Sequence, residues 1–92
     1  MELFKEIIPQ IRFWKHPTGY CVVCQDHTPM GGVWTQDGHT IIRIWHAGEE
    51  YGVTQCRKCG TIYISTYGQK VNREALVKTL MQVLERHGGV KV

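Results

Sequence analysis

Hydrophobic side chains recur at helical spacing near both ends of the chain. At the N-terminal end they predict a short helix that stops near Ile8, because Pro9 removes a backbone donor, followed by an extended stretch through Phe13 and Trp14. At the C-terminal end, Asn72 fits a helix N-cap, and one arc of a helical wheel gathers six apolar residues: Leu76, Val77, Leu80, Met81, Val83 and Leu84. This pattern predicts an amphipathic C-terminal helix that two glycines, Gly88 and Gly89, end.

The central part of the chain alternates apolar and polar residues, which is typical of strands. Residues 33–36 and 39–45 flank Asp37-Gly38, the strongest short signal for a β-hairpin. Within the second of these runs, the alternation predicts that Ile42 and Ile44 share one face of a sheet, while the other face carries Ile41, Arg43 and Trp45.

Further strands are expected at about residues 51–54 and 61–65, with a turn at residues 47–50 before them. The predicted fold class is therefore α+β: a small antiparallel sheet of roughly three to five strands, with a short N-terminal helix and a C-terminal amphipathic helix. A length of 92 residues makes residues 1–92 a single domain. A domain of this size has a thin hydrophobic core, so a bound metal ion would add to its stability.

Two C-x-x-C pairs, Cys21 with Cys24 and Cys56 with Cys59, are the main chemical feature of the sequence. Each pair lets two sulfurs converge on one ion across a tight turn, and four thiolates complete a tetrahedral shell that suits Zn²⁺. The first residues carry charges where a secretory signal needs an apolar run, so we expect a reducing, cytoplasmic location in which cysteines bind metal. The sequence therefore predicts one structural Zn²⁺ ion bound by the four cysteines.

The two cysteine pairs resemble the knuckles of the zinc-ribbon group over about residues 20–65. The second knuckle, Cys56-Arg57-Lys58-Cys59-Gly60, is similar to the usual form, in which glycine follows the second cysteine. The first knuckle, Cys21-Val22-Val23-Cys24-Gln25, departs from that form because it lacks the glycine, which affects the local turn rather than the ligation. The resemblance implies knuckles at the ends of β-hairpins. A treble-clef finger would need a helix directly after the second knuckle, where residues 60–64 predict a strand.

Other chemistries are open to the same residues. A rubredoxin-like iron site uses the same four ligands, but its usual knuckles carry proline and glycine that are largely missing here. A dithiol redox centre needs only one C-x-x-C pair and leaves the other without a role. His27, three residues after Cys24, is an alternative ligand in place of one cysteine. The other histidines are expected to be surface or packing residues, and His87 falls on the apolar arc of the last helix.

The sequence carries no established catalytic motif. His46 and Glu49 ahead of a C-x-x-C pair resemble the zinc-deaminase signature, but the spacing differs and no proline precedes Cys56. A zinc ion with four thiolate ligands also has no open position for a water molecule. We therefore expect a binding module rather than an enzyme.

The surface residues suggest two kinds of partner. A protein partner is favoured, because three Trp and four Tyr are many for a small domain, and Trp34 and Trp45 are candidate interface anchors. The chain would then be a small intracellular subunit, adaptor or regulator of a larger complex, and a homodimer would also satisfy this interpretation.

The alternative is a nucleic-acid-binding zinc ribbon, for example in transcription. It would use Arg57 and Lys58 at the second knuckle and Arg43 beside Trp45, since cations next to aromatic rings bind phosphates and stacked bases. The net charge of +3 permits this function without requiring it. A membrane location is not expected, because no apolar run in the sequence is long enough to span a bilayer.

Overall fold

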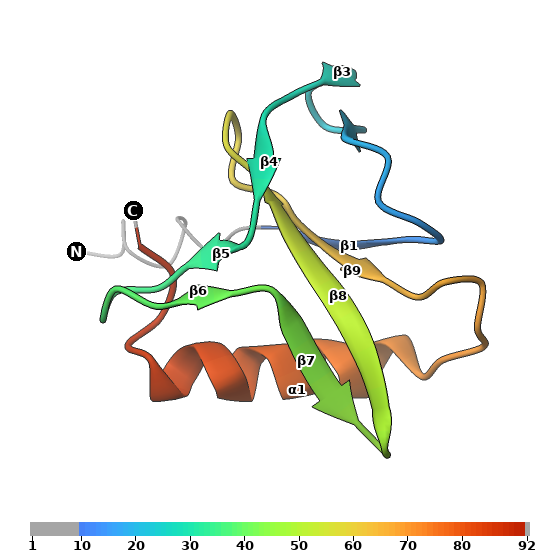
Figure 1. Cartoon of the computed structure of the whole chain (residues 1–92), viewed down its shortest axis with the longest axis vertical. Helices are drawn as coiled ribbons and strands as arrows, with labels where there is room; N and C mark the ends of the chain where they lie inside the picture. Colours follow the sequence, from blue (N-terminus) through green and yellow to red (C-terminus); the bar gives the residue numbers. More distant parts are fainter. Residues whose placement is uncertain (1–9, 92) are drawn as a thin grey trace.

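The computed structural model describes residues 10–91, in which the chain forms nine strands and one helix (Figure 1). In chain order these are β1 (Ile11–Trp14), β2 (Tyr20–Cys21), β3 (Asp26–His27), β4 (Met30–Gly31), β5 (Val33–Trp34), β6 (Thr40–Ile41), β7 (Arg43–His46), β8 (Glu49–Cys56), β9 (Ile62–Ser65) and α1 (Arg73–Arg86). Within the described residues, no helix has the length and apolar character needed to cross a membrane.

The long strand β8 organises the main sheet of the described residues. Along one edge it pairs with β9, and along the other edge it pairs first with β7 and then with β4, all antiparallel. Strand β1 joins the far side of β9 in parallel, with Ile11 opposite Ile62 and Phe13 opposite Ile64. Two shorter pairs, β2 with β3 and β5 with β6, form separate two-stranded sheets.

The predicted fold needs two corrections. The sheet is mixed rather than antiparallel, because β1 lies parallel to β9, and a parallel pair requires the long crossover that the intervening chain provides. The predicted N-terminal helix, ending near Ile8, lies outside the described residues. Within residues 10–91 the only helix is α1, and the first element is strand β1, in the extended stretch predicted through Phe13 and Trp14. The α+β class is otherwise correct.

Helix α1 covers one face of the main sheet and supplies much of the core. Its N-cap is Asn72, whose side chain accepts a hydrogen bond from the Ala75 amide at 3.1 Å, as the sequence predicts. Three leucines of the helix pack with residues of β5, β7, β8 and β9 in a single cluster: Val33, Ile44, Tyr51, Val53, Ile62, Ile64, Leu76, Leu80 and Leu84. Met81, which lies at the margin of the predicted apolar arc, is exposed.

The Asp37-Gly38 hairpin is confirmed, with Val33 opposite Ile41 and Trp34 opposite Thr40 in β5 and β6. The turn predicted at residues 47–50 is found at residues 47–48, where it joins β7 to β8, and Glu49 and Glu50 already belong to β8. The predicted faces beyond the hairpin are wrong, because the second run is two strands interrupted at Ile42. This break leaves Ile42 52% exposed and Ile44 only 1% exposed, so the two isoleucines do not share a face.

Candidate metal centre

The four cysteines come from two similar turns, one after β2 and one after β8. In the first turn the Gln25 amide donates to the Cys21 carbonyl at 2.7 Å, and in the second the Gly60 amide donates to the Cys56 carbonyl at 2.9 Å. Gln25 and Gly60 both have left-handed backbones, with φ of 58° and 87°. Gln25 therefore adopts the conformation that glycine normally provides, at a steric cost of about 1 kcal/mol. The missing glycine of the first knuckle does not change the form of its turn.

The sulfur positions fit a tetrahedral metal shell. The four Sγ atoms all lie within 4.8 Å of one another. Cys21 Sγ lies 3.6 Å from Cys59 Sγ, and Cys24 Sγ lies 3.9 Å from Cys56 Sγ. Zinc–sulfur bonds of about 2.3 Å give a tetrahedron with edges of about 3.8 Å. A disulfide would bring two sulfurs to about 2.05 Å, and all four cysteines are free thiols here.

Neighbouring donors surround the sulfur atoms. The backbone amides of Cys24, Lys58 and Cys59 point at cysteine sulfurs from 3.4–3.5 Å. Hydroxyl groups add to them: Thr28 lies 3.0 Å from Cys56 Sγ, Thr61 lies 3.0 Å from Cys59 Sγ, and Tyr63 donates to Cys21 Sγ at 3.3 Å. Such donors hold thiolates in position and stabilise their charge, as they do around metal-binding cysteines.

The same contacts separate the acidities of the cysteines. Burial alone raises the pKa of Cys56, but hydrogen bonds from Thr28 and from backbone amides lower it to about 6. The pKa of Cys21 is likewise lowered, since the hydrogen bond from Tyr63 and those from backbone amides outweigh burial. Burial and the other three sulfurs raise the pKa of Cys24 to about 12. Four thiolates this close repel one another, and a cation between them would favour the ionised form of all four.

The metal centre is attached to the main sheet through a second apolar cluster. Tyr63 of β9 is 1% exposed, and its ring stacks on Trp14 of β1 with centroids 4.2 Å apart. The Tyr63 hydroxyl reaches the first knuckle, where it accepts from the Val22 amide at 2.9 Å. In Figure 1 the knuckles lie at the top of the view, whereas α1 crosses the bottom. The site is therefore placed by sheet residues and not by the helix.

His27 lies outside the sulfur cluster. It is exposed in β3, and its ring meets the edge of the Tyr20 ring at 5.3 Å between centroids. The ligand group that the described residues form here contains the four cysteines alone.

The basic and aromatic candidates lie at two places, Arg57 with Trp34 and Arg43 with Trp45, rather than on one surface. Arg43 pairs with Glu50 at 2.9 Å, and Arg57 is held by the Gly32 carbonyl at 2.7 Å. Lys58 is exposed at the tip of the second knuckle. Trp34 is 51% exposed in the two-stranded β5–β6 sheet, and Trp45 is 62% exposed in β7 of the main sheet.

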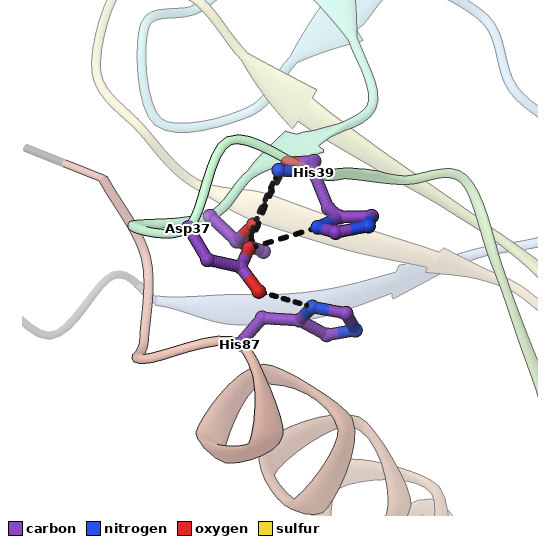
Figure 2. Close-up of polar contacts among 4 residues, drawn as sticks. Asp37, His39 and His87 are labelled. Carbon is purple, nitrogen blue, oxygen red and sulfur yellow. Dashed lines mark hydrogen bonds and ion pairs between the residues drawn. The ribbon is translucent and has the colours of Figure 1, made fainter.

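Sequence reasoning missed one cluster of side chains that could hold a metal ion. Asp37 and His39 of the hairpin turn meet His87 at the end of α1 (Figure 2). A hydrogen bond from Thr35, above all, and others from both histidines lower the pKa of Asp37 despite its partial burial. The sequence shows Asp37 two positions before His39. No local signal linked this pair to His87, which was expected to be a packing residue.

No protein-family model, curated protein or solved structure matches this chain in the comparisons with known proteins. The four-cysteine cluster is a site that could hold a metal ion, on the geometry alone.

Proposed function

We propose that this chain is a structural-zinc module that binds a protein partner through the sheet face opposite α1. The observation that carries the metal part is the convergence of four sulfurs at tetrahedral spacing. The observation that carries the partner part is a group of large side chains left exposed on the sheet. Both parts are expected to act together, because the metal fixes the strands that present this surface.

Zinc is favoured among metal ions by the ligand type. Four cysteine thiolates suit Zn²⁺ or iron, whereas Mg²⁺ and Ca²⁺ prefer oxygen ligands. A complete four-thiolate shell leaves no position for substrate or water, so the ion is proposed to be structural and the protein to act by binding rather than by catalysis. Metal analysis of the protein purified under reducing conditions tests this: about one zinc per chain is expected, and iron in its place would refute the assignment.

The proposed interaction surface is formed by Ile42, Arg43, Trp45, Glu50 and Tyr67, which we call the open face. Arg43 and Trp45 alternate with the buried Ile44, so they point away from α1. One hollow of about 290 Å³ is lined by four of these residues together with Gly52: Ile42, Arg43, Glu50 and Tyr67. Trp45 is 62% exposed and Tyr67 is 47% exposed.

A protein partner suits the open face better than nucleic acid does. Aromatic side chains next to an ion pair match the composition of protein interfaces, where Trp, Tyr and Arg provide most of the binding energy. The guanidinium of Arg43 is already paired with Glu50 and that of Arg57 with a backbone carbonyl, so two of the three basic candidates are not free for phosphates. An acidic side chain inside the surface would also repel a phosphate backbone.

Affinity capture with the zinc-loaded protein and its variants tests the partner proposal. Trp45→Ala is expected to lose partners that the native protein retains in high salt, because an apolar contact is little screened. Met81→Ala is the matched control, since Met81 is 43% exposed on α1 and lies away from the open face. Partners captured equally well by Trp45→Ala would refute the surface, as would binding to mixed oligonucleotides that weakens steeply with salt.

A further inference from the structure

The turn of the β5–β6 hairpin and the end of α1 bring a carboxylate and two imidazoles together (Figure 2). Asp37 Oδ1 lies 3.1 Å from His39 Nδ1, and Asp37 Oδ2 lies 2.8 Å from His87 Nδ1. The two imidazole rings lie side by side, with centroids 4.7 Å apart. The site lies apart from the four cysteines and shares none of their residues.

Backbone contacts fix this arrangement independently of the three side chains. The Asp37 amide donates to the His87 carbonyl at 3.2 Å, and the Gln36 amide donates to the Gly89 carbonyl at 2.9 Å. Thr35 and Val90 continue the contact as an isolated antiparallel bridge. Backbone hydrogen bonds therefore hold the hairpin against the segment after α1 without any contribution from the three side chains.

The carboxylate itself is held in one orientation. The Thr35 hydroxyl, which is fully buried, donates to Asp37 Oδ1 at 2.6 Å. The described residues offer Asp37 no lysine or arginine partner, because its ion pairs are with the two histidines. The Asp37 carboxylate is thus fixed in place, and its ion-pair partners are two histidines, which balance its charge only when they are protonated.

The three ligand atoms have the spacing and chemistry of a metal site. Two ligands of a tetrahedral Zn²⁺ ion, each at about 2.1 Å, lie about 3.4 Å apart, so the Asp–His separations of 3.1 and 2.8 Å need to widen by only a few tenths of an ångström to admit an ion. Imidazole and carboxylate together suit first-row divalent ions such as Zn²⁺. The side chains of Asp37 and His39 are 41% and 65% exposed, so an ion has access from solvent and waters can complete its shell.

We infer that Asp37, His39 and His87 form a second metal site, which binds one divalent cation of the Zn²⁺ class through the carboxylate and the Nδ1 atoms of both imidazoles. Binding needs both Nδ1 atoms unprotonated, so each proton that a ring now shares with the carboxylate moves to Nε2 of that ring or is released to solvent. The bound ion cross-links the hairpin to the end of α1. The site is open to solvent and built of nitrogen and oxygen donors, so it exchanges metal more readily than a closed four-thiolate shell.

Titration of the zinc-loaded protein with further Zn²⁺ tests this inference, with calorimetry and NMR of the histidine ring nitrogens as readouts. One additional Zn²⁺ per chain is expected, with shifts of the His39 and His87 ring signals and little change at His16. Replacing His39 by alanine is expected to weaken this binding by roughly tenfold or more. His39 is the residue of choice, because its exposed side chain can be removed with little effect on folding.

His16→Ala is the matched control, since His16 is exposed and contacts only the Tyr67 ring among aromatic groups. It is expected to bind the additional Zn²⁺ as the native chain does. Asp37→Asn, checked for an unchanged first zinc equivalent, provides a second variant expected to lose the binding. The inference is overturned if the His39 and His87 signals do not move, or if His39→Ala binds the added Zn²⁺ as tightly as His16→Ala.

Discussion

The guanidinium of Arg57 lies over the ring of Trp34, 3.7 Å from its centroid. The same guanidinium donates to the Gly32 carbonyl at 2.7 Å and to Gln55 Oε1 at 3.3 Å. Arg57 follows the first cysteine of the second knuckle, whereas Trp34 lies in the hairpin, so the contact joins the metal centre to the β5–β6 unit. Two residues that the sequence assigned to different partners, nucleic acid and protein, are bound to each other.

This contact predicts that Arg57 stabilises the fold. Arg57→Ala is expected to lower the free energy of unfolding by roughly 1–2 kcal/mol, from the lost cation–π contact and hydrogen bonds. Arg57→Lys is expected to restore little of it, because an ammonium group cannot stack on the ring and reach both oxygens. Thermal unfolding of the zinc-loaded proteins measures the difference, with Lys58→Ala as the exposed neighbouring control. Equal stability of the native and Arg57→Ala chains would contradict a structural role.

Several elements were predictable because their signals are local. The Asp37-Gly38 turn, the Asn72 N-cap and the C-x-x-C spacing each depend on residues within one turn of chain. The spacing also predicted that the four cysteines converge on one site, which the structure bears out. The contacts that bring the two knuckles together, the pairing of β4 with β8 and the hydrogen bond from Tyr63 to Cys21, could not be predicted from sequence.

The failures concern contacts between distant residues. Pairing of β1 with β9 is set by the apolar match of Ile11 with Ile62 and of Phe13 with Ile64, and nothing near β1 shows that its partner is about fifty residues away. The break at Ile42 was hidden because isoleucine continues the β-rich run, and the Ile42 carbonyl still accepts a hydrogen bond from the Val53 amide of β8 at 2.9 Å. His87 was expected to pack, and its polar contact with Asp37 spans a similar distance in sequence.

Removal of the metal is expected to unfold the knuckles. Cys56→Ser should bind no zinc tightly, because it removes one of the four converging sulfurs at a residue that is only 1% exposed. Loss of one ligand and treatment of the native chain with a strong chelator should give similar losses of thermal stability. Zinc content and the melting temperature are the measurements. Full zinc content and an unchanged melting temperature in Cys56→Ser would refute the site.

Asp37 is expected to stay ionised to unusually low pH in the folded protein. Its folded-state pKa is lowered, chiefly by the hydrogen bond from Thr35, below the ordinary carboxyl value of about 3.9. The ionised form therefore stabilises the fold fully above that ordinary value, and the contribution is lost as the pH falls from there through the folded pKa. The NMR shift of the Asp37 carboxyl carbon tests this directly. A titration midpoint at or above the ordinary value would contradict the prediction.

The Tyr63 hydroxyl is expected to increase the affinity of the four-cysteine site for zinc. Burial and the hydrogen bond that it donates to Cys21 raise the pKa of Tyr63 to about 12, so the hydroxyl keeps its proton and donates it to the sulfur. Tyr63→Phe removes this donor but keeps the ring that stacks on Trp14, so the fold should persist. Zinc affinity is expected to fall by roughly 10–100-fold, as it does when outer hydrogen bonds to metal ligands are removed.

Competition with a chromophoric chelator measures the Tyr63 effect, and Tyr20→Phe is the matched control. Tyr20 lies beside the same knuckle, but it is 38% exposed and its ring contacts His27 rather than a sulfur ligand. A fall in zinc affinity for Tyr63→Phe alone would assign the effect to the Tyr63 hydroxyl, through its hydrogen bonds with Cys21 Sγ and the Val22 amide. Equal affinities for both variants would mean that the backbone amides and threonine hydroxyls are sufficient to hold the thiolates, and that Tyr63 serves only to pack the knuckle against the sheet.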